Sequence, residues 1–87
     1  MKIIWTPPFE HDFSALPATL QKRVEKTLRL LDTDFHHPSL HAKKMIGSND
    51  VWEARVSLSY RITYQVSGET LILRRVGSQD VLKKESR

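Results

Sequence analysis

A chain of 87 residues that is 39% hydrophobic and 28% charged has the composition of one small globular domain, which excludes a disordered chain, and we expect this domain to span residues 1–87. Cysteine is absent, which excludes disulfide and thiolate chemistry, and no apolar run resembles a signal peptide or a membrane-spanning helix, so we expect a cytoplasmic protein. The net charge of +4 lies in residues 35–87, where nine bases outnumber five acids, and it indicates either an anionic partner or simply a soluble basic surface.

The first third of the sequence predicts one strand and two helices. Residues 2–5 form a short strand. Thr6 is placed to cap a helix that begins at Pro7, where a missing N–H costs nothing, and whose apolar face comprises Phe9, Phe13 and Leu16. Pro17 starts a second helix, which residues 32–34 end and whose apolar stripe comprises Leu20, Val24, Leu28 and Leu31.

The rest of the sequence predicts four strands. These are a weakly alternating strand over 40–45, two strands within 51–66, and a last strand over 70–76. Segments rich in glycine, proline or small polar residues predict the loop, turns and break around them, at 36–39, 47–50, 67–69 and 77–80. Residues 81–84 are predicted to form a terminal helical turn.

The order β-α-α-β-β-β-β predicts an α+β fold. Two N-terminal helices with apolar stripes pack on one face of a mostly antiparallel sheet, and we expect the other face to be open.

The segment VWEARVSLSYRITYQV (51–66) has the strongest pattern in the chain. Apolar and polar residues alternate in two runs with a break at 57–59, which predicts an antiparallel hairpin. Arg55 and Arg61 fall on the polar phase of the two runs, so we expect both on the open face. Two guanidinium groups on one face repel each other unless an anion lies between them, and this arrangement suits phosphate.

The candidate residues of the open face are mostly cationic. They are Lys43 or Lys44, Glu53, Arg55, Arg61, Thr63 and one of Arg74 and Arg75, with Gln79 and Asp80 at the rim. Arg74 and Arg75 are neighbours on one strand and should point to opposite faces. Leu71 and Leu73 would place Arg74 on the open face, whereas Ile72 and Val76 argue the reverse.

Neither a metal nor a cofactor is expected. The histidines 36, 37 and 41 lack a partner at zinc-type spacing, and the chain has no glycine-rich phosphate loop. A cationic face suits RNA cleavage, because the 2′-hydroxyl of the substrate attacks the adjacent phosphate once the site orients it and neutralises the developing charge. The alternative is that Glu53 and Arg55 form an exposed pair and that Lys43 and Lys44 are only solvated.

Three segments carry a resemblance to a known family: HPSLHAKKMIG (37–47), VWEARVSLSYRITYQV (51–66) and LILRRVGSQDVL (71–82). With the β-α-α start, the chain resembles the RelE/ParE superfamily of toxins from bacterial toxin–antitoxin systems over nearly its whole length. The resemblance implies a RelE-like fold and neutralisation by a cognate antitoxin that wraps the toxin. The RelE-like branch cleaves mRNA in the ribosomal A site, and the ParE-like branch poisons DNA gyrase.

The resemblance also implies roles for individual residues. Arg61 matches the Arg that contacts the scissile phosphate, and Arg55 matches a cationic or His position used in catalysis. His41, Lys43 and Lys44 lie in the strand where some branches place a catalytic His or a phosphate-binding Lys.

The sequence departs from the family pattern at three positions. Glu53 reverses the charge of a Lys in RelE. Gln79 replaces a His or Arg that follows the last strand, and it cannot exchange a proton at neutral pH. Leu82 replaces an aromatic residue that closes some family sites.

The sequence therefore predicts a ribosome-dependent mRNA endonuclease whose partners are an antitoxin, the ribosome and mRNA. Arg55 and Arg61 would stabilise the phosphate, Lys43 or Lys44 would add charge, Glu53 or His41 would act as the base, and Gln79 would orient the substrate. The alternative is a binding toxin without catalysis, either a ParE-like gyrase inhibitor or a silent relative that only binds an antitoxin.

Overall fold

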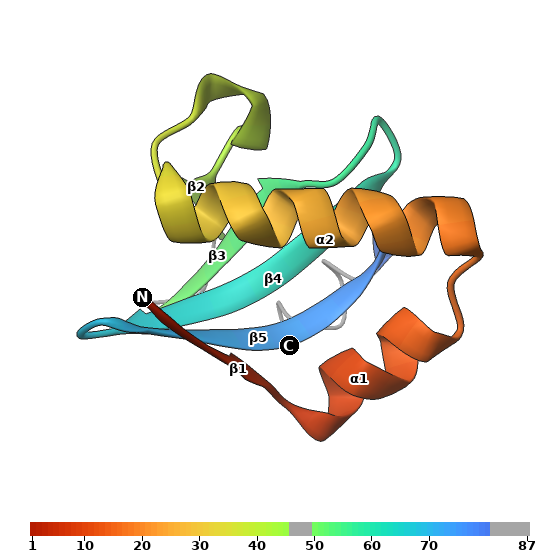
Figure 1. Ribbon diagram of the computed structural model, residues 1–87, viewed down its shortest axis with the longest axis horizontal. Coiled ribbons are helices and arrows are strands. Elements are labelled where there is room, and N and C mark those ends of the chain that lie inside the picture. Colours follow the sequence, from red (N-terminus) through yellow and green to blue (C-terminus); the bar gives the residue numbers. More distant parts are fainter. Residues whose placement is uncertain (46–49, 81–87) are drawn as a thin grey trace.

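The computed structural model describes residues 1–45 and 50–80, which form a five-stranded sheet with two helices (Figure 1). The strand order is β1-β5-β4-β3-β2, with β1 parallel to β5 and the other pairs antiparallel. The elements are β1 (Lys2–Trp5), α1 (Pro7–Ser14), α2 (Ala18–Thr33), a 3-10 turn (Pro38–Leu40), β2 (Lys43–Lys44), β3 (Val51–Arg55), β4 (Tyr60–Ser67) and β5 (Thr70–Ser78). The predicted α+β fold is confirmed.

The core lies between α2 and the sheet, which α2 crosses on one face (Figure 1). Val24, Leu28 and Leu31 of α2 are buried as the stripe predicts, whereas Leu20 is only half-buried and Thr27 is buried. The helix ends at Thr33, where the sequence predicted. No helix in the described ranges has the length and apolar character needed to span a membrane.

Helix α1 lies against β5 beyond the end of β1. Phe9 is fully buried, and the Trp5 ring meets both Phe9 and Phe13 edge-on at centroid distances of 4.9 Å. Thr6 occupies the N-cap position before Pro7, but its side chain makes no cap hydrogen bond, so that detail of the prediction is wrong. The Thr6 hydroxyl instead donates to the Leu73 carbonyl at 2.7 Å, because β1 ends at Trp5 and leaves that part of the β5 edge without a strand.

The predicted strand over 40–45 is reduced to Lys43–Lys44. A 3-10 turn occupies Pro38–Leu40, and His41 follows with a left-handed φ of 45°, which no strand residue adopts. The predicted turn at 47–50 lies outside the described residues except for Asp50, as does the predicted helical turn over 81–84.

The predicted hairpin is confirmed. Strands β3 and β4 are antiparallel with Trp52 opposite Tyr64, Ala54 opposite Ile62, and Arg55 opposite Arg61. Ala54, Ile62 and Tyr64 belong to the core, so Arg55 and Arg61 stand on the alternate phase of their strands.

Strand β5 contains a bulge that the sequence pattern could not place. Thr63 pairs with Arg75 whereas Tyr64 pairs with Leu73, so Arg74 is an extra residue in β5. An extra residue shifts the alternation by one position, and Leu73 before it and Val76 after it are both buried in the core. The strand also continues to Ser78 rather than ending at residue 76.

Candidate functional site

The sheet face opposite α2, here called the far face, carries a row of polar side chains across four strands. The register aligns Lys43 of β2 with Glu53, Glu53 with Thr63, and Thr63 with Arg75. Glu53 is 7% exposed and Thr63 is fully buried. The expectation of an open face is therefore wrong at its centre, where Glu53 and Thr63 are buried.

Glu53 is the acid of this row. Its carboxylate lies 3.7 Å from the Lys43 ammonium, whose side chain is 71% exposed. Lys44 pairs with Trp52 and so falls on the other phase of β2. The sequence left open which of the two lysines lines the far face, and the structure assigns Lys43.

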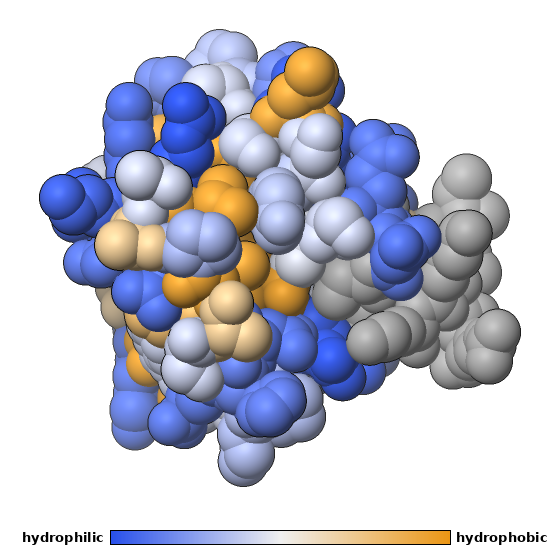
Figure 2. Space-filling view, turned by 90° about the vertical axis from the view of Figure 1, so that its right-hand side faces the viewer, coloured by the Kyte–Doolittle hydropathy of each residue, from blue (hydrophilic) through white to orange (hydrophobic). Residues whose placement is uncertain are grey.

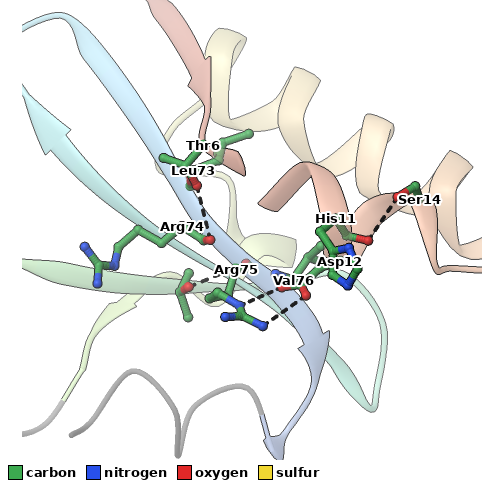
Figure 3. Close-up of polar contacts among 9 residues, drawn as sticks. Thr6, His11, Asp12, Ser14, Leu73, Arg74, Arg75 and Val76 are labelled. Atoms are coloured by element: carbon green, nitrogen blue, oxygen red, sulfur yellow. Dashed lines mark hydrogen bonds and ion pairs between the residues drawn. The ribbon is translucent and has the colours of Figure 1, made fainter. Parts of the chain in front are cut away.

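Arg75 is held by a residue that the sequence did not single out. Its Nε donates to Asp12 Oδ2 at 2.7 Å and its Nη2 to Asp12 Oδ1 at 3.1 Å, and the Val76 backbone N–H donates to Asp12 Oδ2 at 3.2 Å (Figure 3). Asp12 comes from α1, and its carboxylate accepts a hydrogen bond from a β5 backbone N–H that lies beyond the end of β1. Its charge cancels that of Arg75, so Arg75 does not present an unpaired cation.

Arg74 is also on the far-face side. Its Nη1 donates to Gln65 Oε1 at 2.9 Å, and Gln65 alternates with the core residue Tyr64. The prediction that Arg74 and Arg75 point to opposite faces is therefore wrong, because the bulge places consecutive side chains on one side of the sheet. The two side chains nevertheless diverge, with Arg75 directed to α1 and Arg74 away from it (Figure 3).

Arg55 and Arg61 are paired across β3 and β4, on neighbouring strands as predicted, at the end of the sheet next to the β3–β4 loop. The expectation that both lie on the face away from α2 is not met by Arg55, which lines a pocket that α2 also borders. Arg61 Nη1 donates to the carbonyls of its own hairpin, at 2.7 Å to Ser57, 3.1 Å to Leu58 and 3.0 Å to Tyr60. Arg55 Nε is buried and has no hydrogen-bond partner in the described part of the chain. The pair thus combines one guanidinium that supports the loop and one with an unused donor.

Of the other predicted residues, His41 lies apart from this pair and Gln79 lies at the same end of the sheet. His41 lines a pocket of about 320 Å³ with Phe35, Trp52 and neighbouring loop residues. Gln79 is exposed and directly follows β5, at the end of the sheet where Arg61 pairs with Gly77. Within residues 1–45 and 50–80, no group of three or more His, Cys, Asp or Glu side chains could hold a metal ion.

A pocket of about 310 Å³ lies beside the end of β5. Its lining includes His11 and Asp12 from α1, Tyr60 from β4 and Arg75 from β5. No sequence signal points to this group, because His11 and Asp12 look like ordinary polar residues of an amphipathic helix. Only the packing of α1 against β5 reveals them.

Apolar residues are also exposed at the surface. Leu58 in the β3–β4 loop is 79% exposed. On the side of the molecule that lies to the right in Figure 1, hydrophobic residues form a patch bordered by hydrophilic ones (Figure 2). Such bordered patches are common where a protein binds a partner.

Comparison with known sequences identifies the family. Residues 3–81 match the family described as the ParE toxin of type II toxin–antitoxin systems, parDE. The chain is also 30% identical over 78 residues to Toxin RelE3 of Methanocaldococcus jannaschii, a match that covers 87% of this chain and 88% of the relative.

Solved structures share the fold. The RelB–RelE antitoxin–toxin complex of Methanococcus jannaschii superposes with a TM-score of 0.76 at 22% identity, covering 97% of this chain and 99% of the other. The YoeB/ParE toxin of Agrobacterium tumefaciens gives 0.78 at 19% identity, covering 91% and 99%. The E. coli DinJ–YafQ complex gives 0.76 at 15% identity, covering 93% and 96%. The fold and the family match agree, and the chain belongs to the ParE toxin family within the RelE/ParE superfamily of type II toxin–antitoxin systems.

Proposed function

We propose that this toxin is a ribosome-dependent mRNA endonuclease. The observation that carries the proposal is the Arg55–Arg61 pair, two arginines at directly opposite positions at the end of an antiparallel hairpin. The 30% identity to Toxin RelE3 supports the same branch of the superfamily.

The chemistry assigned to the site is attack of the 2′-hydroxyl oxygen on the adjacent phosphorus. The new P–O bond forms as the bond to the 5′-oxygen breaks, the departing 5′-oxygen takes up a proton from water, and Arg55 and Arg61 stabilise the charge of the pentacoordinate phosphate. Gln79 lies beyond β5 at the same end of the sheet as Arg61, where its amide can orient the phosphate.

The proton of the 2′-hydroxyl needs an acceptor. Glu53 is two residues from Arg55 on one strand and shares its phase, whereas His41 lines a separate pocket, so Glu53 is the better-placed candidate. Lys43 lies beside Glu53 and adds positive charge at the edge of the far face.

An antitoxin partner follows from the family, and we infer that an acidic, partly helical segment of the antitoxin covers the far face. Folding onto that face would bury charge and apolar surface together. Hydrogen exchange on the toxin–antitoxin complex should then show added protection in β3, β4 and β5. Protection confined to the outer surface of the helices would contradict this placement.

A second candidate function, inhibition of DNA gyrase without catalysis, is favoured by the charge balance of the far face. Asp12 pairs with Arg75 and Glu53 pairs with Lys43, so these four residues present no net charge to an RNA phosphate. A gyrase inhibitor needs no proton transfer, which also agrees with Gln79 in place of a titratable residue.

Two assays separate the candidates. The wild-type toxin is added to a cell-free translation reaction, and the 5′ ends of the message are mapped with and without ribosomes. The endonuclease should cut within codons on ribosomes and leave naked RNA nearly uncut, and Gln79→His should raise the rate because it introduces a group that titrates near neutral pH. An uncut message together with inhibited gyrase supercoiling establishes the second candidate instead.

A further inference from the structure

A separate pocket of about 490 Å³ lies between α2 and the β3–β4 hairpin. It is lined by Arg23, Lys26 and Thr27 of α2, by Ser39 of the 3-10 turn, and by residues 55–58 at the end of β3 and in the loop. We call it the hairpin pocket. It is formed by segments that are far apart in the sequence and that only the fold brings together.

The lining of the hairpin pocket carries three positive charges and no carboxylate. Arg23 and Lys26 are three residues apart on α2, so they lie on one face of the helix, and Arg55 lines the pocket from β3. Like charges around one pocket repel one another, and an anion bound between them offsets that repulsion by attracting each of them.

The hydroxyl groups of the pocket are mostly committed. Thr27 donates to the Arg23 carbonyl at 3.0 Å, and the Ser39 hydroxyl lies 2.7 Å from His37 Nδ1. The donors left for a ligand are therefore the cationic side chains, together with the Ser57 hydroxyl. This set selects an anion rather than a neutral ligand.

Arg55 supplies the most specific observation. Its Nε is buried without a hydrogen-bond partner in the described residues, and an unsatisfied buried donor is costly. Arg61, directly opposite, has its Nη1 bound to three loop carbonyls. Arg55, with its unused donor, thus lines the hairpin pocket together with two other cationic residues, Arg23 and Lys26.

We propose that the hairpin pocket is a phosphate-binding site for one backbone phosphate of the target nucleic acid. The planar guanidinium groups of Arg23 and Arg55 suit a tetrahedral oxyanion, and a volume of about 490 Å³ leaves room for the adjoining sugar. With this site, the backbone of the bound nucleic acid would run from the Arg55–Arg61 pair past the β3–β4 loop to α2. It rests on the proposed function for the identity of the nucleic acid as RNA.

The first test uses inorganic phosphate as the probe. The Arg55 Nε–H signal in heteronuclear NMR should shift saturably with phosphate and not with chloride at equal ionic strength. The double variant Arg23→Gln/Lys26→Gln should weaken phosphate binding at least about tenfold, since one charge-assisted hydrogen bond is worth roughly that factor. The matched control is Lys22→Gln/Arg29→Gln, which removes the same charge from exposed positions of the same helix outside the pocket.

The second test uses a short single-stranded RNA and varies the salt concentration. Loss of Arg23 and Lys26 should reduce the slope of log affinity against log salt by about 0.7 for each phosphate no longer neutralised, whereas the control should reduce it less. A phosphate response that does not saturate, or equal weakening by the two double variants, overturns the site. Saturable phosphate binding with equal loss of RNA affinity in both variants means that the pocket takes free phosphate, and it overturns the backbone assignment. Neither test reads cleavage, so failure of the nuclease proposal is seen separately.

Discussion

Asp12 and Arg75 are 63 residues apart in the sequence and form a two-point ion pair between α1 and β5, with N–O distances of 2.7 and 3.1 Å. The Asp12 carboxylate also accepts a hydrogen bond from the Val76 backbone N–H. One side chain thus satisfies a backbone donor of β5 and neutralises an arginine of the far face. The pair is only partly exposed, at 13% for Asp12 and 28% for Arg75. The ion pair therefore contributes to the stability of the fold and also lowers the positive charge of the far face.

Asp12→Asn tests the contribution of this ion pair to stability. We expect a loss of about 1–3 kcal/mol in the free energy of unfolding, because the variant weakens charge-assisted hydrogen bonds and leaves Arg75 partly buried without a counter-charge. Urea unfolding followed by circular dichroism measures it. Asp34→Asn, an exposed position at the end of α2, should change stability by less than about 0.5 kcal/mol, and equal effects of the two variants would refute the structural role of Asp12.

Ionisation of Tyr64 lowers the free energy of unfolding at alkaline pH. Burial raises its pKa from 10.0 to about 12 in the folded protein. As the pH rises, the unfolded chain releases this proton before the folded protein does. The stability that the neutral Tyr64 contributes is therefore fully present below pH 10.0 and is lost as the pH rises to about 12. The loss in the free energy of unfolding is roughly 2–3 kcal/mol at most.

Tyr64→Phe isolates this contribution. The Tyr64 hydroxyl has no hydrogen-bond partner among the described residues, so we expect a change of less than about 1 kcal/mol at neutral pH. The stability difference between wild type and variant should then shift in favour of the variant above pH 10.0. A difference that stays constant up to about pH 12 would be inconsistent with a buried, neutral phenol.

Gly68 is required by the β4–β5 turn. Its φ of +59° lies in the left-handed region, and a Cβ there would meet no atom within 4 Å, so any cost of substitution comes from the backbone and not from a clash. Gly68→Ala should destabilise the protein by about 1–2 kcal/mol. Glu69→Ala, at the next turn position, should cost less than about 0.5 kcal/mol in the same thermal unfolding experiment.

Arg61 has two roles: its side chain holds the β3–β4 loop, and we propose that it also stabilises the phosphate during cleavage. Arg61→Ala removes the hydrogen bonds to the loop carbonyls and the charge at the phosphate, and we expect cleavage on ribosomes to fall on the order of 10²–10³-fold. Arg61→Lys keeps the charge but not the planar fork of the guanidinium. If the role is chemical, Arg61→Lys should recover part of the activity, whereas thermal unfolding should report how far each variant weakens the loop. Full activity in a folded Arg61→Ala protein would remove Arg61 from the site.

The sequence alone determined the two helices and the pairing of the hairpin. Alternation over residues 51–66 is a local property of half-buried strands, and it correctly placed Arg55 and Arg61 on neighbouring antiparallel strands, which the structure pairs directly. The apolar stripe of α2 is equally local, since a helix that packs on a sheet must repeat its apolar positions every three to four residues, and Val24, Leu28 and Leu31 are buried as it predicts.

The tertiary structure alone decided how the charged residues are paired. Alternation has no means to report a bulge, so the sequence assigned Arg74 and Arg75 to opposite faces, and one inserted residue in β5 placed them on the same side. Asp12 and Arg75 have no shared motif, because their contact depends on where β1 ends and how α1 packs against β5. Arg23 and Lys26 share a face of α2 because of their spacing, but only the packing of α2 against the β3–β4 hairpin makes Arg55 line the same pocket.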